Sequence, residues 1–213
     1  MLRAFFKIHN SVCRDMLVAA CLLMVGCQGN EHAHQAVADS APAISTTITD
    51  ARGQRVVFPR TPRNIFPLSE AQAEWLYAYG AEGRIAARPK GLEQPPYIVY
   101  KPAIALDSLD STALQKHHID CVLMRNTQVG EFPKLVKLCQ KLDIPVVVQR
   151  FTTLTGIGRE MQQLGALVGR AQQADTLQQR YENYFRDMRL ATAGKARYHT
   201  IIVLQLDPLV VVG

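Results

Sequence analysis

Short apolar runs alternate with helix-like stretches along the central part of this chain. Two strand-like segments, 46–50 and 55–58, come first and flank a turn that contains Gly53. Four further apolar runs have strand length, and helix-like stretches separate them; these runs are 65–68, 84–87, 121–124 and 146–148. This βαβα order predicts a Rossmann-like α/β lobe over residues 46–154, with a mainly parallel sheet covered by helices.

The helices between these runs are predicted at 69–79, 111–118 and 131–142. The first is the best marked, because Ser69 and Gln72 have the spacing of a capping box and Gly80 is a natural C-terminal stop. Trp75 lies four residues before Tyr79 on the same helix, and we expect it in the core.

A longer helical pattern follows the lobe. From residue 157 onward apolar positions recur every three or four residues, which predicts a long linking helix over 155–192. Gly165 and Gly169 each cost about 1 kcal/mol inside a helix, so we expect a break near Gly169. The last apolar stretch, 200–206, has the length of a strand, and residues 193–213 are interpreted as the start of a second, truncated lobe.

The first residues are typical of a targeting segment. Arg3, Lys7 and Arg14 precede an apolar run, 16–26, that is too short to cross a bilayer but suits a signal peptide. We therefore interpret residues 1–26 as a signal peptide, and the mature protein is expected in the cell envelope, on the periplasmic side.

The end of this run resembles a bacterial lipobox, with Met24 at minus three, Gly26 at minus one and then Cys27. Cys27 is thus the predicted lipidation site, and acylation would anchor the protein to a lipid bilayer without spanning it. A plain secretory signal with a chance cysteine is the alternative. Residues 27–45 are polar and poor in large apolar groups, which predicts a flexible spacer.

Composition then narrows the class of protein. With 48% hydrophobic and 20% charged residues in 213, the chain is not disordered throughout. The formal net charge of +6 would fall to +4 without residues 1–26, because that segment holds three basic residues and Asp15. No basic run is interleaved with aromatic residues, so no nucleic-acid partner is predicted.

No catalytic site, metal site or cofactor is predicted. The sequence has neither a Gly-x-Ser-x-Gly nucleophile elbow nor a phosphate-cradling Gly-x-x-x-x-Gly-Lys loop. His32 and His34 lie in the spacer without a third ligand nearby. His117 and His118 are adjacent on a helix and point about 100° apart, so they cannot chelate one ion together.

Two cysteines, Cys121 and Cys139, lie in the predicted lobe. They could form a disulfide in an oxidising compartment. Their apolar surroundings, a strand-like run and the apolar side of a helix, favour two buried free thiols instead.

Several short motifs follow one another in a particular order. In sequence they are TDARGQRV at 49–56, PRNI at 62–65, LS at 68–69, Glu74, YG at 79–80, GRIA at 83–86, PP at 95–96, IDCV at 119–122, IPVV at 144–147 and LGALVG at 164–169. This order resembles the substrate-binding proteins of ABC importers for cobalamin, haem and ferric siderophores, whose two lobes are joined by a long helix. The resemblance covers the N-terminal lobe, the linking helix and the first strand of a C-terminal lobe, so the chain is expected to be a fragment or a truncated product.

The resemblance implies a ligand held between two lobes and an ABC permease as partner. The family tends to carry a glutamate that touches the permease at the start of one helix, and Thr112 stands at that position here. Asp110 lies two residues earlier and could substitute, although an aspartate there is more simply a helix N-cap.

Three arginines follow predicted strands: Arg88, Arg125 and Arg150. In an open α/β sheet the ligand crevice lies outside the carboxyl ends of the strands, so we expect the three guanidiniums to share one rim. Guanidiniums suit carboxylate, catecholate or phosphate groups, which favours an anionic ligand such as a ferric siderophore or haem over cobalamin. Solvated loop arginines are the alternative. Tyr97 and Tyr100 could add stacking surface, or could anchor their loop on the sheet.

These observations favour a lipid-anchored binding protein that captures an iron chelate or related metallo-ligand and delivers it to a permease, without catalysis. An envelope enzyme on a similar α/β lobe is one alternative. A truncated lipoprotein that cannot bind ligand is another.

Overall fold

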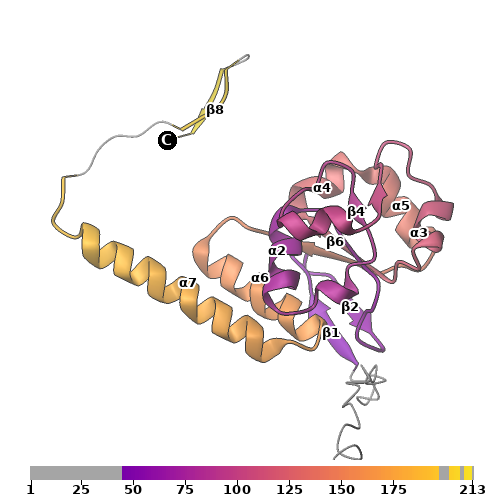
Figure 1. The fold of residues 1–213 in the computed structure, drawn as a ribbon, viewed down its shortest axis with the longest axis horizontal. Helices are drawn as coiled ribbons and strands as arrows, with labels where there is room; N and C mark the ends of the chain where they lie inside the picture. Colours follow the sequence, from indigo (N-terminus) through magenta and orange to yellow (C-terminus); the bar gives the residue numbers. More distant parts are fainter. Residues whose placement is uncertain (1–44, 197–201, 207–208, 213) are drawn as a thin grey trace, which may run out of the picture. The chain divides into compact units, whose positions relative to one another are not determined.

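The computed structural model describes residues 45–196 and, for the backbone alone, residues 202–206 and 209–212 (Figure 1). The predicted signal peptide, Cys27, His32 and His34 lie outside the described residues. No helix in the part of the chain that is described is long and apolar enough to cross a membrane.

The chain begins with the predicted hairpin. Strand β1 (Thr46–Thr49) pairs antiparallel with β2 (Arg55–Phe58). The turn is closed by Asp50, whose carboxylate accepts hydrogen bonds from the backbone N–H groups of Arg52 (2.9 Å) and Gln54 (3.0 Å). Gly53 has a φ of +79°, a conformation that glycine adopts without strain.

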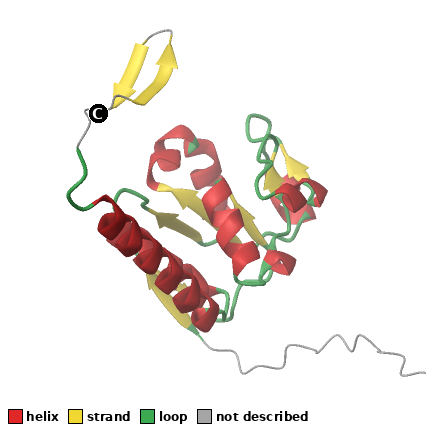
Figure 2. Cartoon of the chain, turned by 60° about the vertical axis from the view of Figure 1, so that its left-hand side comes forward, coloured by secondary structure: helices red, strands yellow, loops and turns green. Residues whose placement is uncertain are grey.

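Three parallel strands form the central sheet, in the order β3–β6–β7. They are β3 (Ile65–Pro67), β6 (Cys121–Arg125) and β7 (Val146–Gln149). Helices flank this sheet, as Figure 2 shows. Burial on both faces explains why these strands consist of continuous apolar runs. The predicted α/β lobe with a parallel sheet is therefore confirmed.

The predicted strand 84–87 is the main error within the lobe. Residues Glu82–Arg84 form a 3₁₀ turn, η1, and Ile85 makes a single parallel bridge to Ile65. The chain then leaves β3, and β4 (Arg88–Pro89) pairs with β5 (Ala103–Ile104) in a separate two-stranded sheet. The apolar run was too short, with only one large side chain, to specify a strand by itself.

Six α-helices are described in the lobe and its extension, together with the 3₁₀ helix η2 (Pro96–Tyr100). Their bounds are α2 (Glu70–Ala78), α3 (Ser111–Lys116), α4 (Asn126–Glu131), α5 (Pro133–Lys141), α6 (Leu154–Leu167) and α7 (Ala171–Thr192). The helix predicted at 131–142 is α5, and α4 before it was missed. Pro133 separates the two, because proline lacks a backbone N–H and fits the first turn of a helix.

Of the two end signals predicted for α2, the C-terminal glycine is confirmed and the N-terminal capping box is wrong. Gly80 ends the helix with a φ of +67°, as predicted. The capping box is wrong: the Ser69 side chain caps no backbone N–H, and Gln72 is buried and donates to Gln149 at 3.1 Å. The local pattern predicted that the Gln72 side chain would cap α2, but this side chain forms a tertiary hydrogen bond to Gln149 instead.

The range 155–192, expected as one linking helix, holds α6 and α7. The break lies at Gly169, whose φ of +67° confirms the predicted interruption. Gly165 allows the two helices to approach, since an added Cβ there would collide with Ala174. Met161 and Leu164 are buried, so α6 contributes side chains to the core of the lobe.

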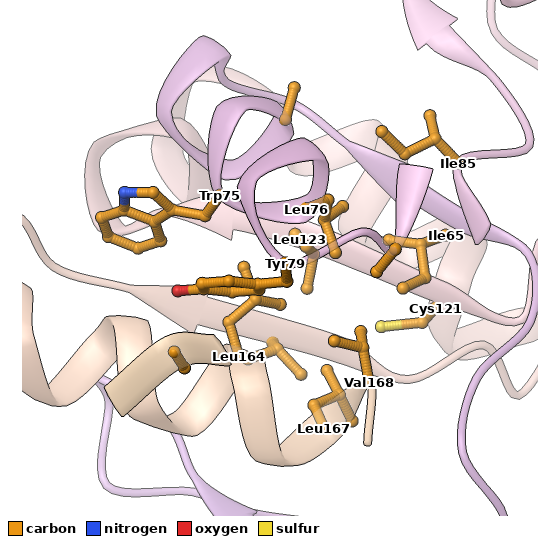
Figure 3. Packing of buried hydrophobic residues seen from close by; sticks show 14 of the residues in the cluster. Ile65, Trp75, Leu76, Tyr79, Ile85, Cys121, Leu123, Leu164, Leu167 and Val168 are labelled. Atoms are coloured by element: carbon orange, nitrogen blue, oxygen red, sulfur yellow. The ribbon is translucent and has the colours of Figure 1, made fainter. Parts of the chain in front are cut away.

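Two clusters of buried side chains form the core. In the first, Trp75, Leu76 and Tyr79 of α2 face Leu164 and its neighbours on α6 (Figure 3). The Tyr79 hydroxyl donates to the Met161 carbonyl at 3.0 Å, and Trp75 packs edge-to-face on Phe151 with ring centroids 5.0 Å apart. The expectation that Trp75 is a core residue is confirmed.

Cys121 and Cys139 are free and buried, which confirms the thiol interpretation over the disulfide. Burial raises the pKa of Cys139 to about 12 and raises that of Cys121 as well. Neither thiol therefore has thiolate character at neutral pH.

The last described strands, β8 (Ile202–Leu206) and β9 (Leu209–Val212), form an antiparallel hairpin. The strand predicted within 200–206 is thus confirmed as β8.

Candidate functional site

Two of the three predicted arginines lie at the carboxyl ends of neighbouring strands. Arg125 is the last residue of β6 and is paired in register with Gln149, the last residue of β7. Arg150 follows directly, and both arginines are exposed. The sheet topology thus brings Arg125 and Arg150 to the same edge, as the strand order predicted.

A hollow of about 450 Å³ opens at this edge, and we call it the carboxyl-edge hollow. It is built by the residues after β3, the first turn of α2, the loop after β4, the end of β6 and the residue that packs on Trp75. These lining residues are Leu68, Ser69, Glu70, Ala71, Pro89, Lys90, Gly91, Leu92, Arg125 and Phe151.

The electrostatics of the carboxyl-edge hollow favour a negatively charged group. The backbone N–H groups of the first turn of α2 face no side-chain cap, because Ser69 makes no capping hydrogen bond. Arg125 and Lys90 add two exposed cations, while Glu70 contributes one carboxylate. Leu68, Leu92 and Phe151 supply apolar walls, so a ligand with both an anionic group and apolar surface suits the hollow.

Gln128 of α4 holds the two strand ends that form this hollow. Its amide oxygen accepts from the backbone N–H of Arg125 at 2.8 Å, and its amide nitrogen donates to the Leu68 carbonyl at 2.9 Å. The side chain is buried. Sequence reasoning missed Gln128, together with Ser69 and Lys90 as lining residues. The position of Ser69 directly after the predicted strand 65–68 was the one usable signal.

Arg150 lines a different hollow, of about 530 Å³, between the β1–β2 turn and the start of α6. We call it the hairpin hollow. Arg150 donates from Nη2 to the Ala51 carbonyl at 3.2 Å, and Thr153 caps α6 by accepting from the Gly156 N–H at 3.0 Å. The remaining lining residues are Thr49, Asp50, Gly53, Thr152, Thr155, Arg159, Glu160 and Gln163.

Glu160 is one of two buried acids that line the hairpin hollow, and Asp50 is the other. Its Oε1 accepts from the Arg150 backbone N–H at 3.2 Å, while Oε2 is buried and has no hydrogen-bond partner among the described residues. Burial raises the pKa of Glu160, since the charged form loses hydration. The Gln149 amide donates to the Glu160 carbonyl at 3.1 Å and accepts from Gln72 at 3.1 Å, which joins α2, β7 and α6 through the core.

Arg88 does not line either hollow. Its guanidinium donates to the backbone carbonyls of Leu92 (3.1 Å), Pro89 (3.4 Å) and Val99 (3.4 Å), and so holds the loop between β4 and η2. The expectation of one rim shared by three guanidiniums therefore needs correction. Arg88 follows no strand of the central sheet, and Arg125 and Arg150 line separate hollows.

Tyr97 and Tyr100 lie on η2 and are 70% and 83% exposed. Ile98, between them, is fully buried and anchors this segment. The two rings are thus available for contact with a ligand and are not what holds the loop on the lobe. The role of Tyr97 in ligand binding stays a prediction.

Asp110 is the N-cap of α3, as expected, because its carboxylate accepts from the Ala113 N–H at 2.9 Å. Thr112 is exposed on the same helix. Within residues 45–196, no group of three or more histidine, cysteine, aspartate or glutamate side chains is placed to hold a metal ion.

No family model matches this sequence. A search of curated protein sequences also finds no match. The similarity to known proteins is therefore structural.

Solved structures share the fold at low sequence identity. A possible iron-binding, periplasmic solute-binding protein from Staphylococcus epidermidis has a TM-score of 0.60 and 18% identity, covering 70% of this chain and 59% of that one. The periplasmic vitamin B12 binding protein of Vibrio cholerae has a TM-score of 0.60 and 15% identity, over 70% and 58%. A periplasmic heme binding protein from Pseudomonas aeruginosa has a TM-score of 0.57 and 16% identity, over 67% and 52%.

These likenesses establish the fold: the chain, with its α/β lobe and long helix, shares the architecture of part of these periplasmic binding proteins. The chain spans between 52% and 59% of the length of these three structures. All three are named as binding proteins, for iron, vitamin B12 and heme respectively.

Proposed function

We propose that this chain is the N-terminal part of an extracytoplasmic substrate-binding protein that captures a ferric siderophore, haem or related metallo-ligand and delivers it to an ABC permease. The role is binding rather than catalysis. The fold likeness to binding proteins for iron, heme and vitamin B12 supports the class.

One observation carries the ligand side of the proposal. The carboxyl-edge hollow combines Arg125, Lys90 and the uncapped first turn of α2 with apolar walls. A ferric siderophore or haem carries anionic oxygens on a largely apolar body, which matches this combination better than cobalamin does. Arg150 at the neighbouring strand end and the exposed Tyr97 ring are the next candidates for contact.

The matched part of this chain covers 59% and 52% of two of the solved binding proteins, so the hollow is proposed as one wall of a cleft and not as a complete site. We expect residues 46–196 by themselves to bind a ligand measurably but weakly, because they supply only one wall of the proposed cleft. A polypeptide that includes a second lobe would bind more tightly.

Isothermal titration of the mature chain with a ferric siderophore, haem and cobalamin tests the proposal. We expect Arg125→Ala to weaken binding of the anionic ligands about tenfold, because one charge-assisted hydrogen bond contributes about 1.5 kcal/mol. Arg60→Ala is the matched control, since Arg60 is an exposed arginine outside both hollows.

Equal losses for Arg125→Ala and Arg60→Ala would mean that net charge, and not this hollow, attracts the ligand. Absence of binding for all three ligands, also with a second lobe present, would contradict the proposed function and favour a ligand-incompetent lipoprotein.

We further propose that Cys27 is acylated and anchors the protein in the cell envelope, on the basis of the lipobox-like residues before it. Metabolic labelling with a fatty-acid analogue should mark the wild-type chain and Cys21→Ser, a control within the same segment. It should not mark Cys27→Ser; a labelled Cys27→Ser variant would contradict the anchor.

A further inference from the structure

Ser69 places a buried hydroxyl in the wall of the carboxyl-edge hollow, and this hydroxyl has no hydrogen-bond partner among the described residues. The residue is only 8% exposed, and its side chain caps no backbone N–H of α2. A buried polar group without a partner costs free energy, so its presence in a folded protein needs an explanation. Its place in the wall of a hollow points to a ligand atom as the missing partner.

The first turn of α2 adds backbone donors beside this hydroxyl. The N–H groups of Glu70, Ala71 and Gln72 donate a hydrogen bond to none of the described residues. Ala73 is the first residue of α2 whose N–H is used, and it donates to the Ser69 carbonyl at 3.1 Å. Free N–H groups at a helix N-terminus carry partial positive charge and bind oxygen anions.

Arg125 brings a further set of donors to the same place. Strand β3 pairs with β6 in parallel register, and the Leu68 N–H donates to the Leu123 carbonyl at 3.0 Å where β3 ends. The sheet therefore sets Ser69, which follows Leu68, beside the end of β6. The Arg125 guanidinium forms no hydrogen bond among the described residues. Its planar fork matches the two oxygens of a carboxylate.

The side-chain charges of the hollow limit the charge of the group that it can take. Arg125 and Lys90 are two exposed cations that line it, and Glu70 is one exposed carboxylate on its α2 side. The lining side chains thus leave one positive charge, to which the helix N-terminus adds about half a charge. This total balances a singly charged carboxylate better than a doubly charged phosphate.

We propose that the carboxyl-edge hollow binds a carboxylate of the ligand that does not coordinate the metal. The Ser69 hydroxyl, the first-turn N–H groups of α2 and the Arg125 guanidinium are its donors, and we call them together the carboxylate seat. This inference rests on the proposed function and narrows the substrate class to metallo-ligands with an uncoordinated carboxylate, such as haem with its propionates. A chelate whose anionic oxygens all bind iron, such as a tris-catecholate, would leave these donors unpaired.

Nuclear magnetic resonance of the isotope-labelled mature chain tests the carboxylate seat with propionate as the probe. Propionate at millimolar concentration should shift the amide signals of residues 70–72, whereas propionamide, which is similar in shape but uncharged, should not. Ser69→Ala should weaken propionate binding about tenfold, because a hydrogen bond to a charged group is lost. Inorganic phosphate should bind more weakly than propionate.

Ser108→Ala is the matched control, since Ser108 is exposed and lies outside the hollow. This substitution should leave the affinity for propionate unchanged. Glu70→Gln should have the opposite effect to Ser69→Ala. It removes the carboxylate that competes with the ligand, so propionate should bind about threefold more tightly. A gain of affinity cannot result from loss of the fold.

Titration with haem and with haem dimethyl ester carries the test to a metallo-ligand. The two compounds share the iron and the apolar ring and differ in the two carboxylates. Haem should therefore bind at least tenfold more tightly than its ester, and Ser69→Ala should reduce this ratio. Trp75 is the only tryptophan of the chain and packs on Phe151 of the hollow, so its fluorescence provides the binding signal.

The outcomes separate this inference from the proposed function. Unshifted 70–72 amides in propionate would overturn the carboxylate seat, whatever the result with haem. Equal affinities for haem and its ester would overturn the narrowed substrate class while the proposed function stands. Tighter binding of phosphate than of propionate would overturn the choice of a carboxylate. Shifted amides without binding of any metallo-ligand would keep the seat and contradict the proposed function.

Discussion

The two hollows lie at the same edge of the sheet, and each combines a helix N-terminus, an N-cap hydroxyl and an arginine. In the hairpin hollow these groups are engaged: Thr153 accepts from the Gly156 N–H, and Arg150 donates to the Ala51 carbonyl. In the carboxyl-edge hollow, Ser69 makes no capping bond, and among the described residues Arg125 forms a hydrogen bond through its backbone N–H and none through its guanidinium.

The difference teaches that position at the carboxyl edge does not decide the role of a residue. The β1–β2 turn packs beside β7, where the Ala51 N–H donates to the Val148 carbonyl at 2.8 Å, and it offers carbonyls that the nearby arginine satisfies. Beside β3 and β6, the loop after β4 lines the hollow, and among the described residues it accepts no hydrogen bond from the Arg125 guanidinium. We therefore interpret the hairpin hollow as mainly structural and the carboxyl-edge hollow as mainly functional.

The largest effect that would test this comparison is expected from Asp50 in the hairpin hollow. Its buried carboxylate forms an ion pair with Arg52 at 2.7 Å and accepts two backbone hydrogen bonds. Asp50→Ala should lower the free energy of unfolding by about 3 kcal/mol, as measured by urea denaturation. The exposed Asp107 accepts only from its neighbour Ser108, so Asp107→Ala should change stability by less than about 0.5 kcal/mol. Similar losses of unfolding free energy for both variants would contradict a structural role of the β1–β2 turn.

The two N-cap residues form a matched pair with an intermediate effect. Thr153→Ala should cost about 1 kcal/mol, because it removes the hydrogen bond to the Gly156 N–H. Ser69→Ala should lie within about 0.5 kcal/mol of the wild type, since the Ser69 hydroxyl caps nothing and is buried without a partner. Equal losses in urea denaturation would show that Ser69 is an ordinary cap and would weaken the contrast between the hollows.

The smallest effect is expected from Glu160 and depends on pH. Because burial raises the pKa of Glu160 above 4.5, the folded state binds the proton more tightly than the unfolded state. Wild-type stability should therefore fall as the pH rises from about 4.5 through the raised pKa. Glu160→Gln should flatten this part of the pH profile of thermal unfolding, whereas Glu74→Gln, at an exposed position of α2, should not. A Glu160→Gln profile parallel to the wild type would show that the carboxyl does not titrate in this range.

Much of the lobe could be predicted because the relevant signals are local or periodic. The strands β3, β6 and β7 are apolar runs bounded by polar residues, and the break at Gly169 follows from the helix propensity of glycine. The prediction of a strand at 84–87 was wrong because pairing in this region depends on tertiary neighbours. Ile85 makes one bridge to β3, and the residues after it pair with β5. Helix α4 was missed since its short sequence carries no helical periodicity that a pattern could reveal.

The candidate site was predicted less completely. Arg125 and Arg150 could be placed at one edge from strand order, but the sequence does not say which carbonyl a guanidinium meets. Arg88 is the clearest case, because its three acceptors lie one, four and eleven residues away in a loop whose path depends on β4 and β5. Gln128 could not be found either, since its partners Leu68 and Arg125 come together only when β3 pairs with β6.

By itself the sequence determined the parallel α/β lobe, the buried thiols and the helix break, because burial periodicity and glycine conformation are properties of short segments. The tertiary structure alone decided which polar groups remain free to meet a ligand. Gln72 and Ser69 show the reason: a side chain's hydrogen-bond partner is the nearest acceptor or donor in space, and for Gln72 that is Gln149, 77 residues away. Arg125 and Arg150 differ for the same reason, because the Ala51 carbonyl lies within reach of the Arg150 guanidinium, whereas Arg125 lines the other hollow.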